Sequence, residues 1–134
     1  MNVVQVPRRF VRHEWGGTET VVLETSRRLI ARGHSTYVAS TTALADRRGE
    51  DLDGVPVRRF PYFYPYLGLS APARRRLDQK GGNLFSWSLM AHLATVPGLD
   101  VIHLHTGKRL GGIARMVARQ RRVPYVLSLH GGMF

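Results

Sequence analysis

The sequence predicts an α/β fold in which helices cover both faces of a doubly wound, mainly parallel sheet. Short apolar segments alternate with amphipathic segments from residue 3 to residue 129, with glycine or proline at several of the junctions. Such alternation is typical of parallel strands joined by right-handed helical crossovers. A chain of 134 residues is long enough for one domain with its own hydrophobic core.

The first strand and helix are expected to flank a glycine pair. Residues 3–6 (VVQV) form an apolar strand, and after a polar connection Gly16 and Gly17 precede a helix at residues 20–32, followed by a strand at residues 35–40. This order brings backbone N–H groups to the carboxyl edge of a parallel sheet, where the helix dipole favours a phosphate. Gly16 and Gly17 are therefore candidates for phosphate contact, and the alternative is that they only turn the chain.

The glycine pair does not complete the dinucleotide-binding fingerprint. That fingerprint requires G-x-G-x-x-G and an acidic residue about 20 positions further on. No third glycine stands in register, and the strand at residues 35–40 ends without an acid. NAD binding is therefore not expected, and no cofactor is predicted.

The middle of the chain begins with a polar loop and a short strand. Residues 41–53 are polar and charged, which predicts a surface loop. Residues 55–60 are expected to form an edge strand, because Pro56 has no N–H to donate to a neighbouring strand.

An aromatic segment follows at residues 61–70. Prolines within it make a regular helix or a central strand unfavourable. Aromatic rings stack on sugars and bury apolar area, so Tyr62 and Tyr64 are candidates for acceptor contact or for a lipid-facing surface. The alternative is that this segment packs under a loop.

The remaining elements continue the alternation. An arginine-rich helix is expected at residues 73–80, and Asn83 can cap a second helix at residues 84–96. A buried strand at residues 100–105 then leads into a helix at residues 107–122, and the last strand is expected at residues 125–129.

Histidines occupy the ends of the two last strands. His103 and His105 share one face of their strand, and His105, nearer the carboxyl edge, is the better candidate for contact with an acceptor, together with Thr106 and Lys108. No third ligand lies near them and cysteine is absent, so no metal site is predicted. His130 ends the last strand, where a histidine can bond a polar substrate or a developing charge.

The net charge of +11, from 20 basic and 9 acidic residues, leaves two interpretations open. The charge could attract a polyanion such as an anionic lipid surface, or it could be a solvated surface whose arginines complement helix C-termini. No nucleic-acid-binding motif is present, so nucleic acid is not an expected partner.

Cysteine usage and hydropathy bear on the compartment. No cysteine is present, which fits a reducing compartment. The sequence has neither a spanning apolar run nor the layout of a signal peptide. A cytoplasmic location is therefore expected, with attachment to the inner face of the plasma membrane as a further expectation.

Two groups of motifs resemble one enzyme family. GGTE at residues 16–19, ETSRRL at residues 24–29 and RGH at residues 32–34 resemble the opening of retaining GT-B glycosyltransferases of family 4, group 1. DVIHLH at residues 100–105 and VPYVLSLHG at residues 123–131 resemble the later strand pair of that family, in the same order and at a similar spacing.

The resemblance implies one half of a two-domain enzyme with its site in the interdomain cleft. The chain would be the Rossmann-like, acceptor-side N-terminal half of a GT-B fold, incomplete at its C-terminal end. Gly16 and Gly17 match the loop near the donor diphosphate, and His130 matches the histidine at the reacting centre. The C-terminal domain that normally holds the nucleotide has no counterpart in these 134 residues.

The same resemblance implies the reaction. The family moves a sugar from a nucleotide-diphosphate sugar to a glycan, a lipid-linked or a small-molecule acceptor, as in cell-surface polysaccharide synthesis. Transfer retains the anomeric configuration and needs no metal. The chain alone is expected to be inactive, either as a fragment or as one subunit of a split enzyme whose partner binds the donor.

Two other functions stay open. The charge and the aromatic segment favour a non-catalytic binding or scaffold module at an anionic membrane surface. A GT-B-like sugar-nucleotide epimerase is the nearest alternative enzyme.

Overall fold

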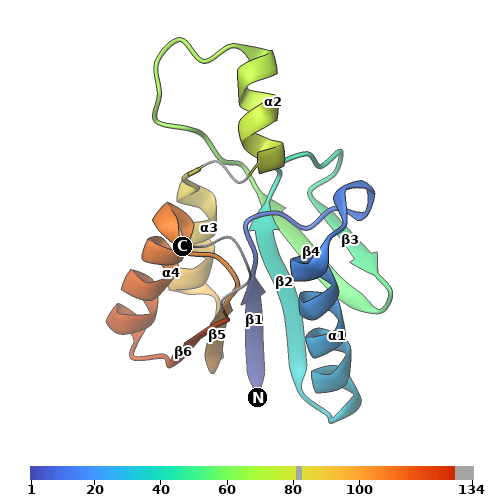
Figure 1. Cartoon of the computed structure of the whole chain (residues 1–134). Helices are drawn as coiled ribbons and strands as arrows, with labels where there is room; N and C mark the ends of the chain where they lie inside the picture. The colour runs from blue at the N-terminus through green and yellow to red at the C-terminus, as the bar shows by residue number, and fades with distance from the viewer. Residues whose placement is uncertain (81–82, 129–134) are drawn as a thin grey trace.

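A computed structural model describes residues 1–80 and 83–128, which form a six-stranded sheet with helices on both faces (Figure 1). The strands are β1 (Asn2–Val6), β2 (Ser35–Thr41), β3 (Gly49–Leu52), β4 (Val55–Phe60), β5 (Val101–Leu104) and β6 (Tyr125–Leu127). The helices are α1 (Gly17–Ala31), α2 (Ala71–Lys80), α3 (Trp87–Thr95) and α4 (Lys108–Arg121), with a 3-10 turn at Arg12–Glu14. The predicted α/β class is confirmed.

The sheet is mainly parallel and has the strand order β3-β4-β2-β1-β5-β6. β1 pairs in parallel with β2 on one side and with β5 on the other, and only β3 runs antiparallel. The chain therefore starts in the middle, builds outward through β2 and β4, and then returns to the other side of β1. The connection that follows β1 and the connection that follows β5 lie on opposite faces of the sheet. Ligands bind at such a switch point in open α/β sheets.

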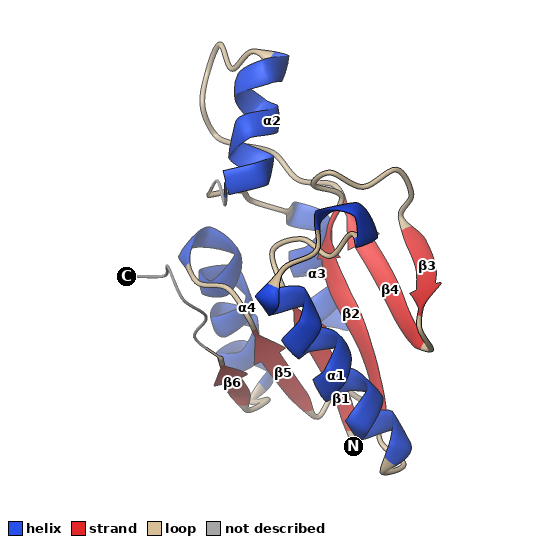
Figure 2. Cartoon of the chain, turned by 45° about the vertical axis from the view of Figure 1, so that its right-hand side comes forward, coloured by secondary structure: helices blue, strands red, loops and turns tan. Residues whose placement is uncertain are grey.

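Helices pack on both faces because the strands are apolar on both. α1 lies on one face and α3 and α4 lie on the other (Figure 2). The α1 side of the core contains Phe10, Val22, Leu23, Val38, Leu52, Val55 and Val57. The opposite side is larger and includes Val4, Val6, Leu89, Leu93, Ile102, Leu104, Leu110, Ile113 and Val117.

The expectation of a loop at residues 41–53 followed by an edge strand is wrong in one respect. Residues 49–52 form β3, which pairs with β4 through a two-residue turn, so β4 is an inner strand. Asp53 and Gly54 in that turn have φ of 52° and 89°, as a tight hairpin turn requires. Pro56 is tolerated because β2 pairs with β4 only from Val57 onward, so no bond to β2 is lost.

The predicted helix cap at Asn83 is also corrected. Ser86 caps α3, because its hydroxyl accepts the N–H of Leu89 at 3.2 Å. The side-chain oxygen of Asn83 instead accepts the N–H of Arg109 at 2.9 Å, in the first turn of α4. Asn83 thus satisfies an N–H at the start of a helix that is distant in sequence.

The loop that follows β5 packs tightly against the start of α4. A Cβ atom at Gly111 would lie 2.5 Å from the carbonyl oxygen of Thr106, which is a backbone atom and cannot rotate away. Gly112, the next residue in the same helix, has nothing within 4 Å of its Cβ position. Glycine at position 111 therefore sets the position of the loop at residues 105–107.

We expect Gly111→Ala to lower the free energy of unfolding by about 1–3 kcal/mol, because the new methyl group displaces the Thr106 carbonyl. The matched control Gly112→Ala adds the same group in open space and should raise stability by about 0.5–1 kcal/mol through helix propensity. Urea unfolding of both variants tests this. Equal changes would show that the close approach at Gly111 does not exist.

Candidate functional site

The candidate site lies at the carboxyl edge of the sheet, at the switch point between β1 and β5. The loop after β1 is held in place by the end of β2, where Ser40 donates to the carbonyl of Pro7 at 2.9 Å and Thr41 to that of Arg8 at 2.6 Å. The loop after β5 is held by the N–H of His105, which donates to the carbonyl of Val6 at 3.0 Å. Two well-fixed loops therefore border this edge.

The glycine pair lies at the N-terminus of α1, which begins at Gly17, three residues earlier than predicted. Both glycines are exposed, and neither has a positive φ. Their backbone conformation therefore does not demand glycine. A Cβ at Gly17 would meet nothing within 4 Å, so the missing side chain leaves the first turn of the helix open to a ligand.

Glu19 modifies the charge at this helix end. Its buried carboxylate accepts the N–H of Gly16 at 3.1 Å, which satisfies one of the N–H groups of the helix start. A carboxylate there already offsets part of the positive end of the helix dipole. A ligand phosphate would therefore interact with the first-turn N–H groups beyond Gly16.

His103 in β5 and His105 just after it form polar contacts with the segments on both sides of this strand. The rings of His103 and His105 lie 4.0 Å apart between centroids. Nε2 of His105 lies 2.8 Å from Oε1 of Gln5 on β1, and Nε2 of His103 lies 2.7 Å from the hydroxyl of Ser128. His105 is only 4% exposed, so its ring is oriented by Gln5 within the sheet edge.

The other residues predicted at this edge differ in accessibility. Thr106 is half-buried and Lys108 is exposed, and both follow β5 directly. Lys108 has a φ of 55°, the left-handed conformation that non-glycine residues adopt at a cost of about 1–3 kcal/mol. The backbone at Lys108 is therefore strained, and strained residues of this kind occur often at functional sites.

Tyr62 and Tyr64 converge on one carboxylate. Their hydroxyls donate to Asp78 of α2 at 2.5 and 2.7 Å, and the rings meet edge to face. Tyr64 is buried, whereas Tyr62 is half-buried. The structure thus shows both tyrosines holding α2 above the carboxyl edge of the sheet (Figure 1), and their contact with an acceptor stays a prediction.

Arg8 joins this cluster from the loop after β1. Its guanidinium donates to the backbone carbonyl of Asp78 at 2.5 Å. Burial lowers the pKa of Arg8, while the phenol of Tyr64 acts in the opposite direction. Among the described residues, a second guanidinium nitrogen of Arg8 has no hydrogen-bond partner, and Nη1 of Arg9 has only an ion-pair contact of 3.7 Å with Glu14. Sequence reasoning did not single out these two arginines, which look like ordinary loop charges before the fold brings Asp78 to Arg8.

His130 and the glycines after it lie outside the described residues. His105, Thr106 and Lys108 follow β5 in sequence, and the loop that leads from β1 to Gly16 and Gly17 begins at the end of the neighbouring strand. The role of each as a site residue stays a prediction. Within residues 1–80 and 83–128, no three histidine, aspartate or glutamate side chains gather closely enough to hold a metal ion.

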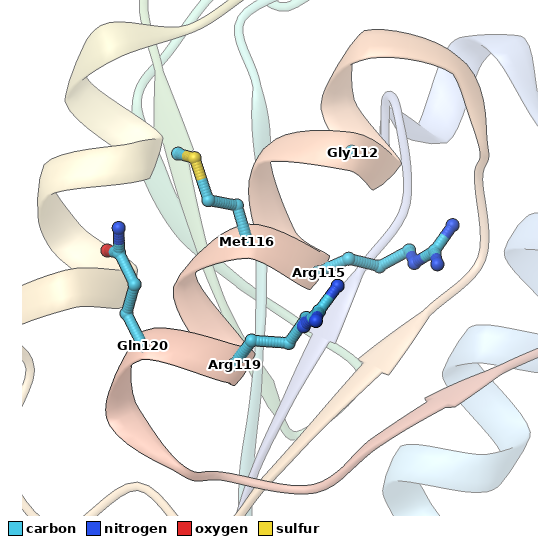
Figure 3. A pocket seen from close by; sticks show the side chains of 5 residues that line it. All are labelled: Gly112, Arg115, Met116, Arg119 and Gln120. Carbon is cyan, nitrogen blue, oxygen red and sulfur yellow. The ribbon is translucent and has the colours of Figure 1, made fainter.

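A shallow hollow of about 400 Å³ lies on the outer surface of α4 (Figure 3). Its lining residues all come from this one helix: Gly112, Arg115, Met116, Arg119 and Gln120. None of the residues predicted for the site contributes to it. The hollow therefore does not coincide with the candidate site at the strand ends.

The strand order and the helices on both faces define a Rossmann-like α/β domain with a switch point between β1 and β5. Residues 16–134 match the model of the glycosyl transferase 4-like domain, which covers most of the chain. The chain belongs to this family of glycosyltransferase domains. A search of curated proteins finds no match.

Of the helices in the described part of the chain, none has the length and apolar character needed to cross a membrane.

The tyrosines around Asp78 predict a loss of stability in alkali. Burial, followed by the bond to Asp78, raises the pKa of Tyr62 to about 12, and the same causes raise that of Tyr64. Burial likewise raises the pKa of Tyr37 to about 12. The unfolded chain loses these protons near pH 10, so the stabilisation is complete below that pH and is lost as the pH rises through the folded pKa.

We expect the urea midpoint to fall between about pH 10 and 12 in the wild-type chain. Tyr64→Phe should make this fall shallower, because one phenol with a raised pKa is removed. Tyr66→Phe is the matched control. The hydroxyl of Tyr66 accepts from Arg109 and is not one of the two that donate to Asp78. An unchanged slope in Tyr64→Phe would rule out a raised pKa for the Tyr64 phenol.

Proposed function

We propose that the chain is the acceptor-side, N-terminal domain of a retaining glycosyltransferase that uses a nucleotide-diphosphate sugar. The observation that carries the proposal is the pair of loops at the switch point, one with exposed glycines at a helix N-terminus and one with His105, Thr106 and Lys108. The family match supports glycosyl transfer as the reaction class.

In this proposal the first turn of α1 approaches the donor diphosphate. The open surface at Gly17 allows phosphate oxygens to reach backbone N–H groups, whose dipoles point the right way without reorganisation. As the glycosidic bond to the diphosphate breaks, negative charge develops on the leaving oxygen. Fixed N–H dipoles and basic side chains would stabilise that charge more in the transition state than in the bound donor.

The acceptor would lie on the opposite side of the reacting centre, against the loop after β5. Thr106 and Lys108 offer a hydroxyl and an ammonium group for sugar or phosphate oxygens. His130 is proposed as the histidine at the reacting centre, and Tyr62 and Tyr64 as the outer border of the acceptor site. No metal is needed in this proposal, because the charge on the diphosphate is met by N–H groups and basic side chains.

The nucleotide itself would be held by a C-terminal donor-binding domain or by a partner subunit. The cleft between the two halves would form the complete site, so we propose that the isolated chain does not turn over. A cytoplasmic location fits a donor of this class. The same two-half arrangement would also serve a sugar-nucleotide epimerase, which transfers no sugar to a second molecule.

Binding of inorganic pyrophosphate to the isolated chain tests the helix end directly. We expect its addition to shift the backbone amide resonances of Gly17 and Thr18 in a ¹⁵N-labelled sample. Gly17→Val should abolish these shifts while leaving the unfolding midpoint nearly unchanged, because nothing lies within 4 Å of a Cβ atom at this position. Shifts confined to other regions would contradict the proposed diphosphate contact.

Transfer is tested after fusion to the donor-binding domain of a glycosyltransferase of the same family. The fusion should release nucleoside diphosphate only when a sugar acceptor is present, and Gly16→Val or Gly17→Val should lower that rate about tenfold or more. Full activity in both variants would refute the role of the glycines. Conversion of the donor sugar without an acceptor would identify an epimerase instead.

A further inference from the structure

Exposed apolar side chains gather around the connection between β4 and α3. Phe63, Tyr66, Leu67 and Trp87 are 39%, 46%, 104% and 62% exposed, and we call these four residues the aromatic rim. Phe63 and Trp87 both contact the ring of Phe85, with centroids 5.5 and 4.6 Å apart, so the two ends of this connection are adjacent. Burial of such side chains is favourable, so a rim of this kind marks an interaction surface.

Cations surround the aromatic rim. Arg74, Arg75 and Arg76 project from the first half of α2 and are all exposed. The guanidinium of Arg74 lies 4.9 Å from the ring centre of Tyr62, and that of Arg109 lies 5.7 Å from the ring centre of Tyr66. Basic side chains therefore lie against aromatic rings at two places in residues 61–70.

Negative charge is nearly absent from the same stretch. Residues 61–99 contain a single acidic residue, Asp78. Its carboxylate is buried and accepts the hydroxyls of Tyr62 and Tyr64, so it does not present a charge to the solvent. Residues 61–99 therefore contribute positive charge to the surface and no exposed acid.

The position of this surface fits an extended partner. α2 stands beyond the carboxyl edge of the sheet, away from the layers formed by α1, α3 and α4 (Figures 1 and 2). Tyr62, Tyr64 and Arg8 hold α2 in place through Asp78, so its exposed arginines keep a fixed position relative to the segment that carries the rim.

We propose that α2 and the aromatic rim form a docking surface for an anionic lipid bilayer. Trp and Tyr favour the interface between water and hydrocarbon, Leu67 would enter the acyl region, and the arginines would meet lipid phosphates. A nucleic acid would use the arginines but offers no apolar phase for Leu67. Together with the proposed transferase function, on which this step rests, the docking surface implies an acceptor carried by a lipid.

Vesicle binding of the whole chain tests the docking surface. Trp15→Phe leaves Trp87 as the only tryptophan, because the chain has two. With vesicles of phosphatidylcholine and phosphatidylglycerol we expect co-sedimentation and a blue shift of the Trp87 emission, and with pure phosphatidylcholine neither. Failure to bind the anionic vesicles, or equal binding to both kinds, would overturn the proposal.

Two variants separate specific docking from diffuse charge. Changing Arg74, Arg75 and Arg76 to serine should weaken binding about fivefold for each arginine, or about a hundredfold in total. The charge-matched control changes Arg27 and Arg28 of α1 and Arg32, which follows that helix, to serine. It should lower binding much less. An equal loss in both triple variants would overturn the docking surface.

Leu67→Ser provides a variant that cannot disturb the core, since this side chain is fully exposed. It should weaken vesicle binding about tenfold or more through the lost apolar burial, with an unchanged unfolding midpoint. Unchanged binding would contradict insertion of the rim. These measurements use no sugar nucleotide, so their failure leaves the pyrophosphate test of the transferase function intact, and the reverse also holds.

Discussion

The pairing of β1 with β2 on one side and with β5 on the other decides where the remaining segments can lie. Since β1 is central and parallel to both neighbours, the connections that leave β1 and β5 at their carboxyl ends must diverge to opposite faces. That divergence leaves room at the edge between the two loops. The site residues reach this edge from parts of the sequence about a hundred positions apart, as the bond between Gln5 and His105 shows.

Close backbone packing then limits how the second loop can move. The Thr106 carbonyl sits against Gly111, and Asn83 holds the first turn of α4 from outside the helix. A strained φ at Lys108 persists because these contacts over-determine the loop. These contacts fix the backbone after β5, which suits the preorganised charge stabilisation that the proposed function needs.

Asp78 joins α2 to the two tyrosines of the aromatic segment and to the loop after β1. Its carboxylate accepts two tyrosine hydroxyls and its carbonyl accepts the guanidinium of Arg8. Asp78 is the only acidic residue between residues 61 and 99, and these bonds hold α2 beside the strand ends. Tyr62 and Tyr64, which the sequence predicts as candidates for acceptor contact, thus hold in place the helix that carries the proposed docking surface.

The order and type of the main elements follow from the sequence alone, because apolar periodicity and glycine or proline punctuation are local properties. The Asp53-Gly54 pair is an equally local hairpin signal. The prediction of an edge strand at residues 55–60 was wrong because it did not include this hairpin. Partner choice is different. Asn83 and Ser86 are both good caps by residue type, and only the packing of α4 beside Asn83 decides between them. The sequence by itself determined the parallel α/β order and the glycine pair at a helix start. Only the tertiary structure decided which buried polar groups meet, because each such bond joins segments whose separation in space depends on the whole sheet.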